Sequence, residues 1–550
     1  MSFDEIQTTR VNGSRRLRAD EGKVQFHLPS ARLWRGPALV LIGLIFVMVG
    51  GADSDLRTAD ARVGLAAKAG LGPLGQVYGQ WKPDVWPLRV AASRLALLLE
   101  EPGRPLSGTV LWPSAIAGLV AGWLVARRLL SLEATRMSLL FGFAWFGSVA
   151  LLDHSSSLGF DFLTGMAMIA ALDRLIGRGS DWVAGLWASL AFLSGGWPPL
   201  IVVALAVIVL GRRNADFSLK LIAPPVVVSV LWMAWAVQSA SIEAAAAALA
   251  WPLTQKPAWT LGLQVLSLGL PLSPFALLLV SGPLRKTLRD SGRGMVIDWL
   301  QIGVAAAIGG SMIPGLATSA RCVALMGILV AAAAALDAAW SGILSTRARR
   351  AFMGVVVALT ACWVFVSVYG GYLMTIAFPY YRSVGIAASI LSVVAIGCVW
   401  WSFETRNGRR SVVAMLLLTA CLKLVHWGYY TPEWNYRYGQ GPWGRAISQW
   451  LMPNWTLYTT HEWSEELAWT IGRPIRQING PRHLDYPATS ESKHVLLLES
   501  EFENWPESAP KLIKVASFEA PYGSRRVLAR TEGALLSSDG REMKGPTRAE

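Results

Sequence analysis

Long apolar runs recur along almost the whole chain, and they constrain its fold more than any other feature. A helix needs about 20 mostly apolar residues to cross a bilayer. The fifth and sixth runs, at 182–195 and 197–211, are short, and the Gly-Gly-Trp-Pro-Pro segment at 195–199 between them is either a tight turn or a break within a re-entrant pair. The pattern predicts a polytopic α-helical membrane protein with about 13 transmembrane helices, near residues 36–51, 108–130, 137–152, 158–177, 182–195, 197–211, 218–239, 258–282, 297–317, 322–341, 351–371, 384–402 and 411–428.

The distribution of basic residues predicts the orientation of these helices. The net charge of +14 would suit a nucleic-acid-binding protein, but only 16% of the residues are charged, against about a quarter in soluble domains. Basic residues gather in alternate connections, which the positive-inside rule assigns to the cytoplasm together with the Arg-rich N-terminus. We therefore expect no nucleic-acid partner and a C-terminal region on the opposite side. The basic connections contain Arg127, Arg128 and Arg136; Arg174 and Arg178; Arg212, Arg213 and Lys220; Arg285, Lys286, Arg289 and Arg293; Arg347, Arg349 and Arg350; and Arg406, Arg409 and Arg410.

The composition also divides the chain into regions. Residues 1–35 form a basic cytoplasmic N-terminus, and 36–430 form the transmembrane region. After Tyr429 the composition becomes mixed, and we expect a small periplasmic α/β domain at 431–535, followed by a disordered tail at 536–550. Within that domain the pattern predicts a helix at 463–471, with Glu465 and Glu466 on an exposed side, and strands at 493–498 and 526–529.

The large polar loop at 52–107 is the segment that we expect to carry the function, at the mouth of a membrane-embedded cavity. We predict two amphipathic helices in it, one ending at Ala69 and one from Leu88 to Leu99. A carboxylate here could take a proton from a hydroxyl acceptor, and Arg or Lys could hold a phosphate leaving group. This combination indicates group transfer from a lipid phosphate; the alternative is a solvated loop whose charges pair with one another and with lipid head groups. The charged residues that crowd around the start of the first helix are Asp53, Asp55, Arg57, Asp60, Arg62, Lys68, Lys82 and Asp84.

Residues 58–68, Thr-Ala-Asp-Ala-Arg-Val-Gly-Leu-Ala-Ala-Lys, and the following Trp81-Lys82-Pro83 resemble the first periplasmic loop of the GT-C glycosyltransferases. The lipid A aminoarabinose transferases and related polyprenyl-phosphate sugar transferases are the most similar members. Segment 141–172, with Asp153 and Asp161, resembles the part of that family that carries a second acid, and 190–196 resembles its Ala-Phe-Leu-Thr-Lys-Gly motif. Thirteen spans followed by a periplasmic α/β domain also resemble the aminoarabinose transferases.

The resemblance implies an inverting glycosyltransferase of the bacterial inner membrane. Its donor would be a polyprenyl-phosphate-linked sugar, and its acceptor lipid A, a polysaccharide or a protein on the periplasmic side. The predicted catalytic acids are Asp60 or Asp55 as the base, with Asp161 or Asp153 as the second acid. The predicted donor-phosphate ligands are Arg62, Lys82, Arg57 and Arg321.

Three positions depart from the family's pattern. Ala59 stands where the first acid of an Asp-Glu pair is usual, and Gly195 replaces a Lys that faces the donor phosphate in relatives. Trp81 replaces a metal-binding Glu, and no His or Cys spacing indicates a metal site. We therefore predict no cofactor, although a weakly held divalent cation on a diphosphate stays open. A non-enzymatic lipid-binding scaffold or a transporter, built on a degenerate GT-C shell, is the alternative function.

Overall fold

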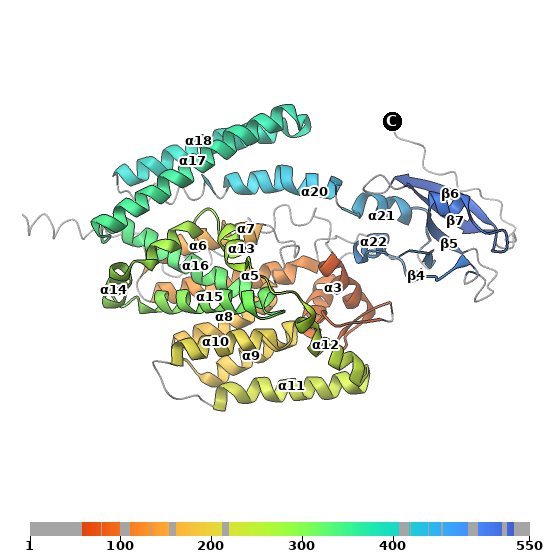
Figure 1. Ribbon diagram of the computed structural model, residues 1–550, viewed down its shortest axis with the longest axis horizontal. Coiled ribbons are helices and arrows are strands. Elements are labelled where there is room, and N and C mark those ends of the chain that lie inside the picture. The colour runs from red at the N-terminus through yellow and green to blue at the C-terminus, as the bar shows by residue number, and fades with distance from the viewer. Residues whose placement is uncertain are drawn as a thin grey trace, which may run out of the picture.

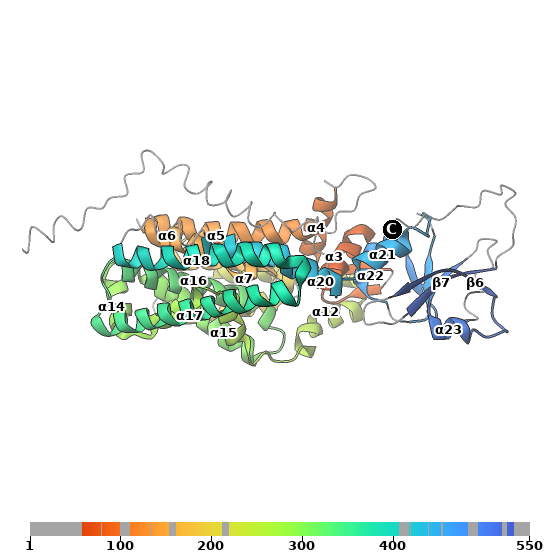
Figure 2. The same cartoon turned by 90° about the horizontal axis from the view of Figure 1, so that it is seen from above.

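The structure is a computed structural model of an elongated molecule with a helical bundle at one end and a β-sheet domain at the other (Figures 1 and 2). Helix α3 and its neighbours lie between the two parts. The structure describes residues 58–78, 80–98, 110–131, 134–152, 161–211, 219–405, 417–418, 420–437, 439–452, 455–461, 463–481, 484, 493–519 and 525–532.

The helices of the bundle lie close to the predicted spans in the sequence. Six described helices are long and apolar enough to cross a membrane, as in a multi-pass membrane protein. They are α5 (Trp112–Ser131), α11 (Leu219–Ser239), α15 (Gly294–Met312), α16 (Ala317–Trp340), α17 (Thr346–Ile376) and α18 (Arg382–Thr405) with the short turn η4 (Pro379–Tyr381) before it. The shorter helices are α6 (Thr135–Phe146), α7 (Val149–Leu152), α8 (Phe162–Ile176), α9 (Asp181–Gly195), α10 (Pro198–Gly211), α12 (Ile242–Thr254), α13 (Leu261–Leu268) and α14 (Gly282–Asp290).

Two predicted spans are wrong as continuous helices. The span at 258–282 is divided into α13 and the 3-10 helix η3 (Ser273–Val280). Pro271 lies between them, and proline has no N–H to continue a helix and clashes with the preceding turn. The span at 137–152 is likewise divided into α6 and α7, with Gly147 as the C-cap of α6. The span at 36–51 and most of the span at 411–428 lie outside the described residues.

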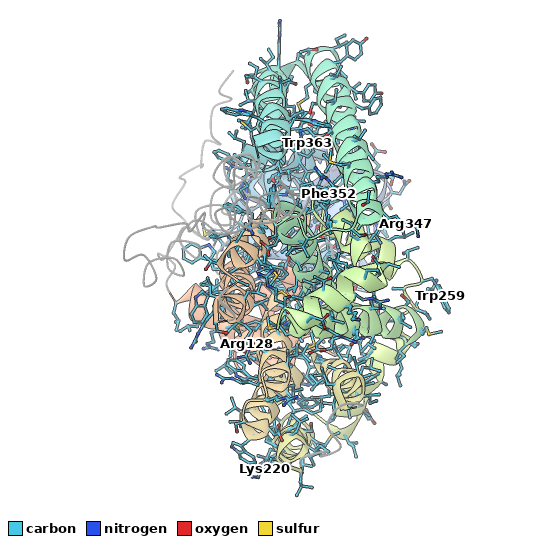
Figure 3. All side chains as sticks on the ribbon, turned by 90° about the vertical axis from the view of Figure 1, so that its left-hand side faces the viewer. Arg128, Lys220, Trp259, Arg347, Phe352 and Trp363 are labelled. Carbon is cyan, nitrogen blue, oxygen red and sulfur yellow. The ribbon has the colours of Figure 1, made fainter. Side chains whose placement is uncertain are left out.

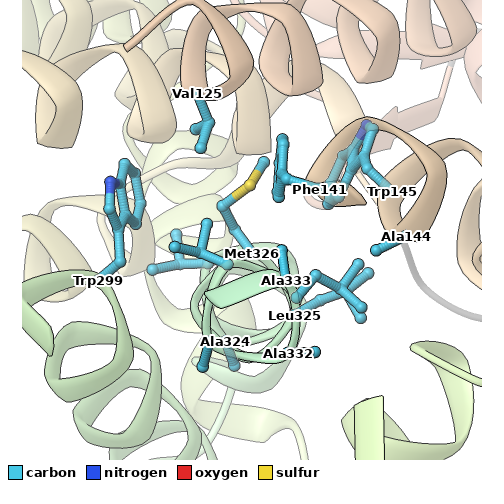
Figure 4. Close-up of a cluster of buried hydrophobic side chains, with 14 of the residues drawn as sticks. Val125, Phe141, Ala144, Trp145, Trp299, Ala324, Leu325, Met326, Ala332 and Ala333 are labelled. Carbon is cyan, nitrogen blue, oxygen red and sulfur yellow. The ribbon is translucent and has the colours of Figure 1, made fainter. Parts of the chain in front are cut away.

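Helix α16 is the centre of the bundle. Almost all of its side chains are buried, and residues 331–335 are five consecutive alanines. Figure 4 shows Met326 of this helix among Val125, Phe141, Trp145 and Trp299 from neighbouring helices. Small side chains let helices approach closely where lipid offers no hydrophobic drive for association. The run of alanines therefore marks a helix surrounded by protein.

Helices α17 and α18 pack on each other at the side of the bundle and expose most of their apolar side chains (Figure 1). Phe365 and Tyr372 of α17 are 65% and 59% exposed, and Val393 of α18 is 69% exposed. Exposed apolar surface of this extent marks a region that lipid or another protein covers.

Basic side chains gather at the end of the bundle that is remote from the sheet domain. The carboxylate of Asp337, at the end of α16, accepts hydrogen bonds from Arg136 (2.6 Å) and Arg293 (2.6 Å), and Asp173 pairs with Arg128 (3.2 Å). Figure 3 shows the molecule from this end, with Arg128 labelled. Arg136 and Arg293, from two of the basic connections predicted to be cytoplasmic, thus meet at Asp337.

The predicted polar loop folds as α3 (Thr58–Ala69), a hairpin of β1 (Gly75–Val77) and β2 (Gln80–Lys82), and α4 (Pro87–Leu97). Trp86, the N-cap of α4, anchors the loop to the bundle. Its ring lies 4.9 Å from that of Trp232 and 5.6 Å from that of Phe192. Gly196 has φ +75°, and a Cβ there would lie 2.4 Å from the Trp86 ring. The Gly-Gly-Trp-Pro-Pro segment is therefore a tight turn that needs glycine under Trp86.

The C-terminal domain contains a mixed five-stranded sheet in the order β4-β3-β5-β7-β6. Strand β5 pairs in parallel with β3 and antiparallel with β7. The helix expected at 463–471 and both predicted strands are present. The elements are the π-helix η5 (His426–Tyr430), α20 (Thr431–Arg437), α21 (Gly441–Ser448), β3 (Leu457–Thr459), α22 (Glu465–Ile471), β4 (Ile475–Gln477), β5 (His494–Leu498), α23 (Glu499–Glu503), β6 (Leu512–Glu519) and β7 (Arg525–Thr531).

Candidate functional site

The first loop and the C-terminal domain share one hydrophobic core. Buried apolar side chains of α3, the hairpin and α4 pack with those of α21, α22 and the sheet. Helix α22 lies on α3, where Trp469 covers Gly64 and the ammonium of Lys68 lies 3.9 Å from the centre of the Trp469 ring. The Tyr78 hydroxyl donates to the carbonyl of Arg473 (2.9 Å). The candidate site therefore lies between two parts of the chain that are held firmly together.

An ionic cluster lies in this interface and contains two of the predicted phosphate ligands. Arg62 of α3 donates to Oδ2 of Asp84 (2.5 Å) through one guanidinium nitrogen and to Oε1 of Glu465 (3.1 Å) through Nε. Nζ of Lys82, at the end of β2, lies 3.7 Å from the same Glu465 oxygen. Two cations from different elements thus share one carboxylate oxygen. We call Arg62, Lys82, Asp84 and Glu465 the loop cluster.

The loop cluster is partly shielded from water. The exposed fractions are 21% for Arg62, 24% for Lys82, 23% for Asp84 and 12% for Glu465. Burial alone lowers the pKa of Arg62, but the charges of Asp84 and Glu465 together raise it above the ordinary value. The guanidinium therefore stays charged, as an anion-binding group must. Glu465 was predicted to be exposed, and this is wrong, because the Arg62 and Lys82 side chains draw it into the interface.

Asp60 lies in the first turn of α3, where the positive end of the helix dipole favours a carboxylate. Its side chain is half-buried. Asp60 and Arg62 are two positions apart on one helix, so they do not face each other. The guanidinium of Arg62 donates instead to Asp84 and Glu465.

Asp161 forms a second cluster at the start of α8. It is the N-cap of that helix, and its Oδ1 accepts from the Thr164 amide (3.2 Å). Its Oδ2 accepts from the Thr164 hydroxyl and from Arg89 of α4. The sequence pattern predicted that Asp161 lies a turn inside a span. That placement is wrong. The side chain of Asp161 accepts from the amide three residues later, which makes Asp161 the N-cap, the residue just before the first turn of the helix.

Gly195 lies beside this second cluster. A Cβ at position 195 would lie 3.0 Å from the Thr164 methyl group and 3.1 Å from its hydroxyl. Arg89 is ion-paired with Asp161 at the same place. A cation is therefore present beside a position where the resemblance led us to expect a lysine.

Arg321 lies in the first part of α16 and donates to Oε1 of Gln264 (3.0 Å) on α13. The next residue, Cys322, is buried, and its sulfur would lie 2.4 Å from a Cβ at Gly165 of α8. Since Gly165 belongs to the first turn of α8, Arg321 and Asp161 lie near the same helix contact.

The remaining predicted site residues, Asp55, Arg57 and Asp153, lie outside the described residues. Within the described part of the chain, no three His, Cys, Asp or Glu side chains come together in an arrangement that could hold a metal ion.

The sequence pattern missed the roles of three charged residues of these clusters: Glu465, Arg89 and Asp84. Oδ1 of Asp84 is buried and accepts no hydrogen bond from any described residue. Asp84 and Arg89 flank the start of α4 and lie in one short segment that links the two clusters. The sequence contained a signal for the position of Asp161, because Asp three residues before Thr164 has the spacing of an N-cap. It contained no signal for the pairing of Glu465 with Arg62.

The fold matches solved structures, although neither family models nor curated proteins give a match to this chain. Two crystal structures of ArnT from Cupriavidus metallidurans match at 14% identity over 90% of this chain and 97% of theirs. One is in the apo state (TM-score 0.66), and the other is bound to undecaprenyl phosphate (TM-score 0.67). The resemblance to the GT-C aminoarabinose transferases is confirmed at the level of the fold.

Proposed function

We propose that this protein is a GT-C-type glycosyltransferase that moves a sugar from a polyprenyl-phosphate donor to an envelope acceptor. The acceptor is lipid A, a polysaccharide or a protein, and the reaction takes place on the periplasmic side of the bacterial inner membrane. The N-terminus is then cytoplasmic and the C-terminal domain periplasmic. The proposal rests most of all on one observation: the two cations Arg62 and Lys82 lie on the first loop of an ArnT-like fold.

In the proposed reaction a carboxylate, Asp60 or Asp55, takes the proton of the acceptor hydroxyl. The acceptor oxygen attacks C1 of the sugar from the face opposite the phosphate, so that the configuration at C1 is inverted. The bond between C1 and the phosphate oxygen breaks, and its electron pair stays on the departing polyprenyl phosphate. Arg62, Lys82, Arg57 and Arg321 stabilise the charge that develops there.

The second acid, Asp161 or Asp153, has a different role in this proposal. Asp161 holds Arg89 and the start of α8 in place through its two oxygens. It therefore orients a cation near the donor, and Asp153 is the alternative for this position. No step in the proposed reaction passes through a metal ion.

Two observations favour the alternative function, a lipid-binding scaffold or transporter that has lost catalysis. Ala59 and Gly195 stand where the resemblance leads us to expect Asp and Lys, and Arg62 and Lys82 are held by carboxylates of the chain itself. A scaffold needs to bind a lipid phosphate but does not need a base.

Mass spectrometry of envelope lipids and glycans separates the two functions. It compares a deletion strain with strains rescued by the wild type, by Asp60→Asn and by Asp55→Asn at equal expression. We expect one glycan to be missing after deletion and to stay missing with Asp60→Asn. Restoration by both Asn variants would exclude these two acids as the base. An unchanged glycan profile after deletion would contradict the transferase and favour the scaffold.

A further inference from the structure

Glu465 occupies the position between Arg62 and Lys82 that a bound anion would take. Its Oε1 lies 3.1 Å from Arg62 Nε and 3.7 Å from Lys82 Nζ. Two cations, one from a helix and one from a hairpin strand, thus surround a single oxygen. A phosphate oxygen in a protein site has the same kind of environment. Glu465 itself comes from α22, 403 positions along the chain from Arg62.

The two cations remain accessible while Glu465 is in place. Arg62 and Lys82 keep 21% and 24% exposure, and Glu465 keeps only 12%. The shared core fixes the backbone of α22, because Leu467, Trp469 and Ile471 are all buried in it. Displacement of Glu465 therefore requires rotation of one side chain and no movement of the C-terminal domain.

Arg62 would not lose all its support in such an exchange. Asp84 lies on another nitrogen of the same guanidinium and would continue to orient it. Lys82 has no such second carboxylate among the pairs that the structure gives, so its ammonium would turn fully to the new anion. The pair is thus arranged to exchange one anionic oxygen for another.

We infer that Glu465 is an internal competitor for the phosphate site, displaced when a phosphate group binds and returning when it leaves. This inference rests on the proposed function for the identity of the site and deepens it. A phosphomonoester carries a charge of about −1.5 to −2 at neutral pH, which exceeds the single charge of a carboxylate, so it can displace Glu465. The returning carboxylate weakens retention of the departing phosphate and so aids its release.

Binding measurements on the purified full-length protein in detergent test this inference. The probes are farnesyl phosphate, a lipid phosphomonoester, and inorganic phosphate, which has the same head group without a chain. The test variant is Glu465→Gln, which keeps the size of the side chain and removes its charge. The matched control is Glu499→Gln, because Glu499 is an acid of the same domain that pairs with Lys514 (3.6 Å) and Arg525 (3.8 Å) instead.

We expect Glu465→Gln to bind farnesyl phosphate about fivefold more tightly than the wild type, the change that loss of one partly exposed ion pair would give. Glu499→Gln should bind as the wild type does. An equal gain with inorganic phosphate would show that the head group suffices, and a gain with farnesyl phosphate alone would identify a lipid ligand; both support the inference. Unchanged or weaker binding of both probes by a folded Glu465→Gln would overturn it.

Glu465→Asp keeps the inference testable if Glu465→Gln does not fold. Aspartate is well tolerated in the first turn of a helix, but its shorter side chain cannot reach both cations. We expect its affinity for farnesyl phosphate to lie between those of the wild type and Glu465→Gln, and an affinity at or below that of the wild type would count against the inference. Because binding does not require sugar transfer, a protein with no glycan phenotype could still show these changes. Failure of the proposed function and failure of this inference are therefore distinguishable.

Discussion

Trp469 of the C-terminal domain lies directly over Gly64 of α3, and a Cβ at position 64 would come within 2.7 Å of its ring. This contact joins two parts of the chain that lie about four hundred positions apart. It also explains why a helix that faces a folded domain contains glycine, a residue that costs about 1 kcal/mol relative to alanine in a helix interior.

Gly64→Ala should destabilise the protein even though alanine is the better helix former. The added methyl group forces the indole aside, and overpacking of this kind costs about 1–3 kcal/mol. Thermal unfolding in detergent measures the effect. Gly354→Ala in α17 is the matched control, because no atom outside the neighbouring backbone of α17 lies within 4 Å of a Cβ there, and it should be neutral or stabilising. A Gly64→Ala variant as stable as this control would contradict the packing of α22 on α3.

The buried Asp337 should depend on its two arginines jointly. Its carboxylate is 2% exposed, while Arg136 and Arg293 are 41% and 26% exposed. We expect either single change to Gln to be mild, because the other arginine remains. The double variant leaves an unpaired buried charge and should cost about 3 kcal/mol. Thermal unfolding of the two single variants and the double variant measures the coupling, and strictly additive effects would refute it.

His494 should make the protein less stable as the pH falls from 6.5 to 4. Burial, with a smaller contribution from the nearby charge of Arg530, lowers the pKa of His494 from 6.5 to about 4. The unfolded chain therefore binds more protons than the folded one in this window, and up to ~3 kcal/mol of stability is lost.

His494→Phe should remove this pH dependence. The ring of His494 stacks on Trp455 at 4.3 Å, and phenylalanine can keep that contact without titrating. Unfolding midpoints of both proteins between pH 4 and 7 provide the measurement. Parallel curves for wild type and variant would show that His494 is not the group responsible.

Asp161 substitutions should separate a structural role from a role in transfer. Asparagine is as good an N-cap as aspartate, whereas replacement by alanine costs about 1 kcal/mol. Asp161→Asn should therefore be more stable than Asp161→Ala. Both lose the charge that holds Arg89, so both should lose the proposed transfer activity to a similar extent if Asp161 orients that cation. Substantial activity in Asp161→Asn alone would indicate that only the cap matters.

The elements with strong local signals could be predicted from the sequence. Ala61 and Leu65 lie four positions apart on one helix face and are both buried, and α3 ends at Ala69 as predicted. The span at 258–282 was predicted as one helix because hydrophobicity alone does not report the break that Pro271 introduces. The local pattern thus predicted that the segment is apolar and helical, but it did not predict that the helix is divided in two.

The loop cluster could be predicted only in part, because its geometry depends on distant contacts. Arg62 and Lys82 were identified from the loop, but Glu465 is an ordinary first-turn acid in the sequence and acquires its role only when α22 packs on α3. Likewise, nothing local to Asp60 indicates that Arg62 turns away from it toward Asp84. Side-chain partners of this kind follow from the tertiary fold.

The core shared by α3 and α22 has a consequence for how the chain is made. The ribosome synthesises α3 early, but its apolar face is completed only when α21, α22 and β5 emerge, after the whole membrane bundle. Contacts between such distant segments form slowly, and the waiting surface is exposed to association meanwhile. The first loop must therefore wait for the last part of the chain, so a chain that stops before α22 leaves that loop uncovered and open to proteolysis.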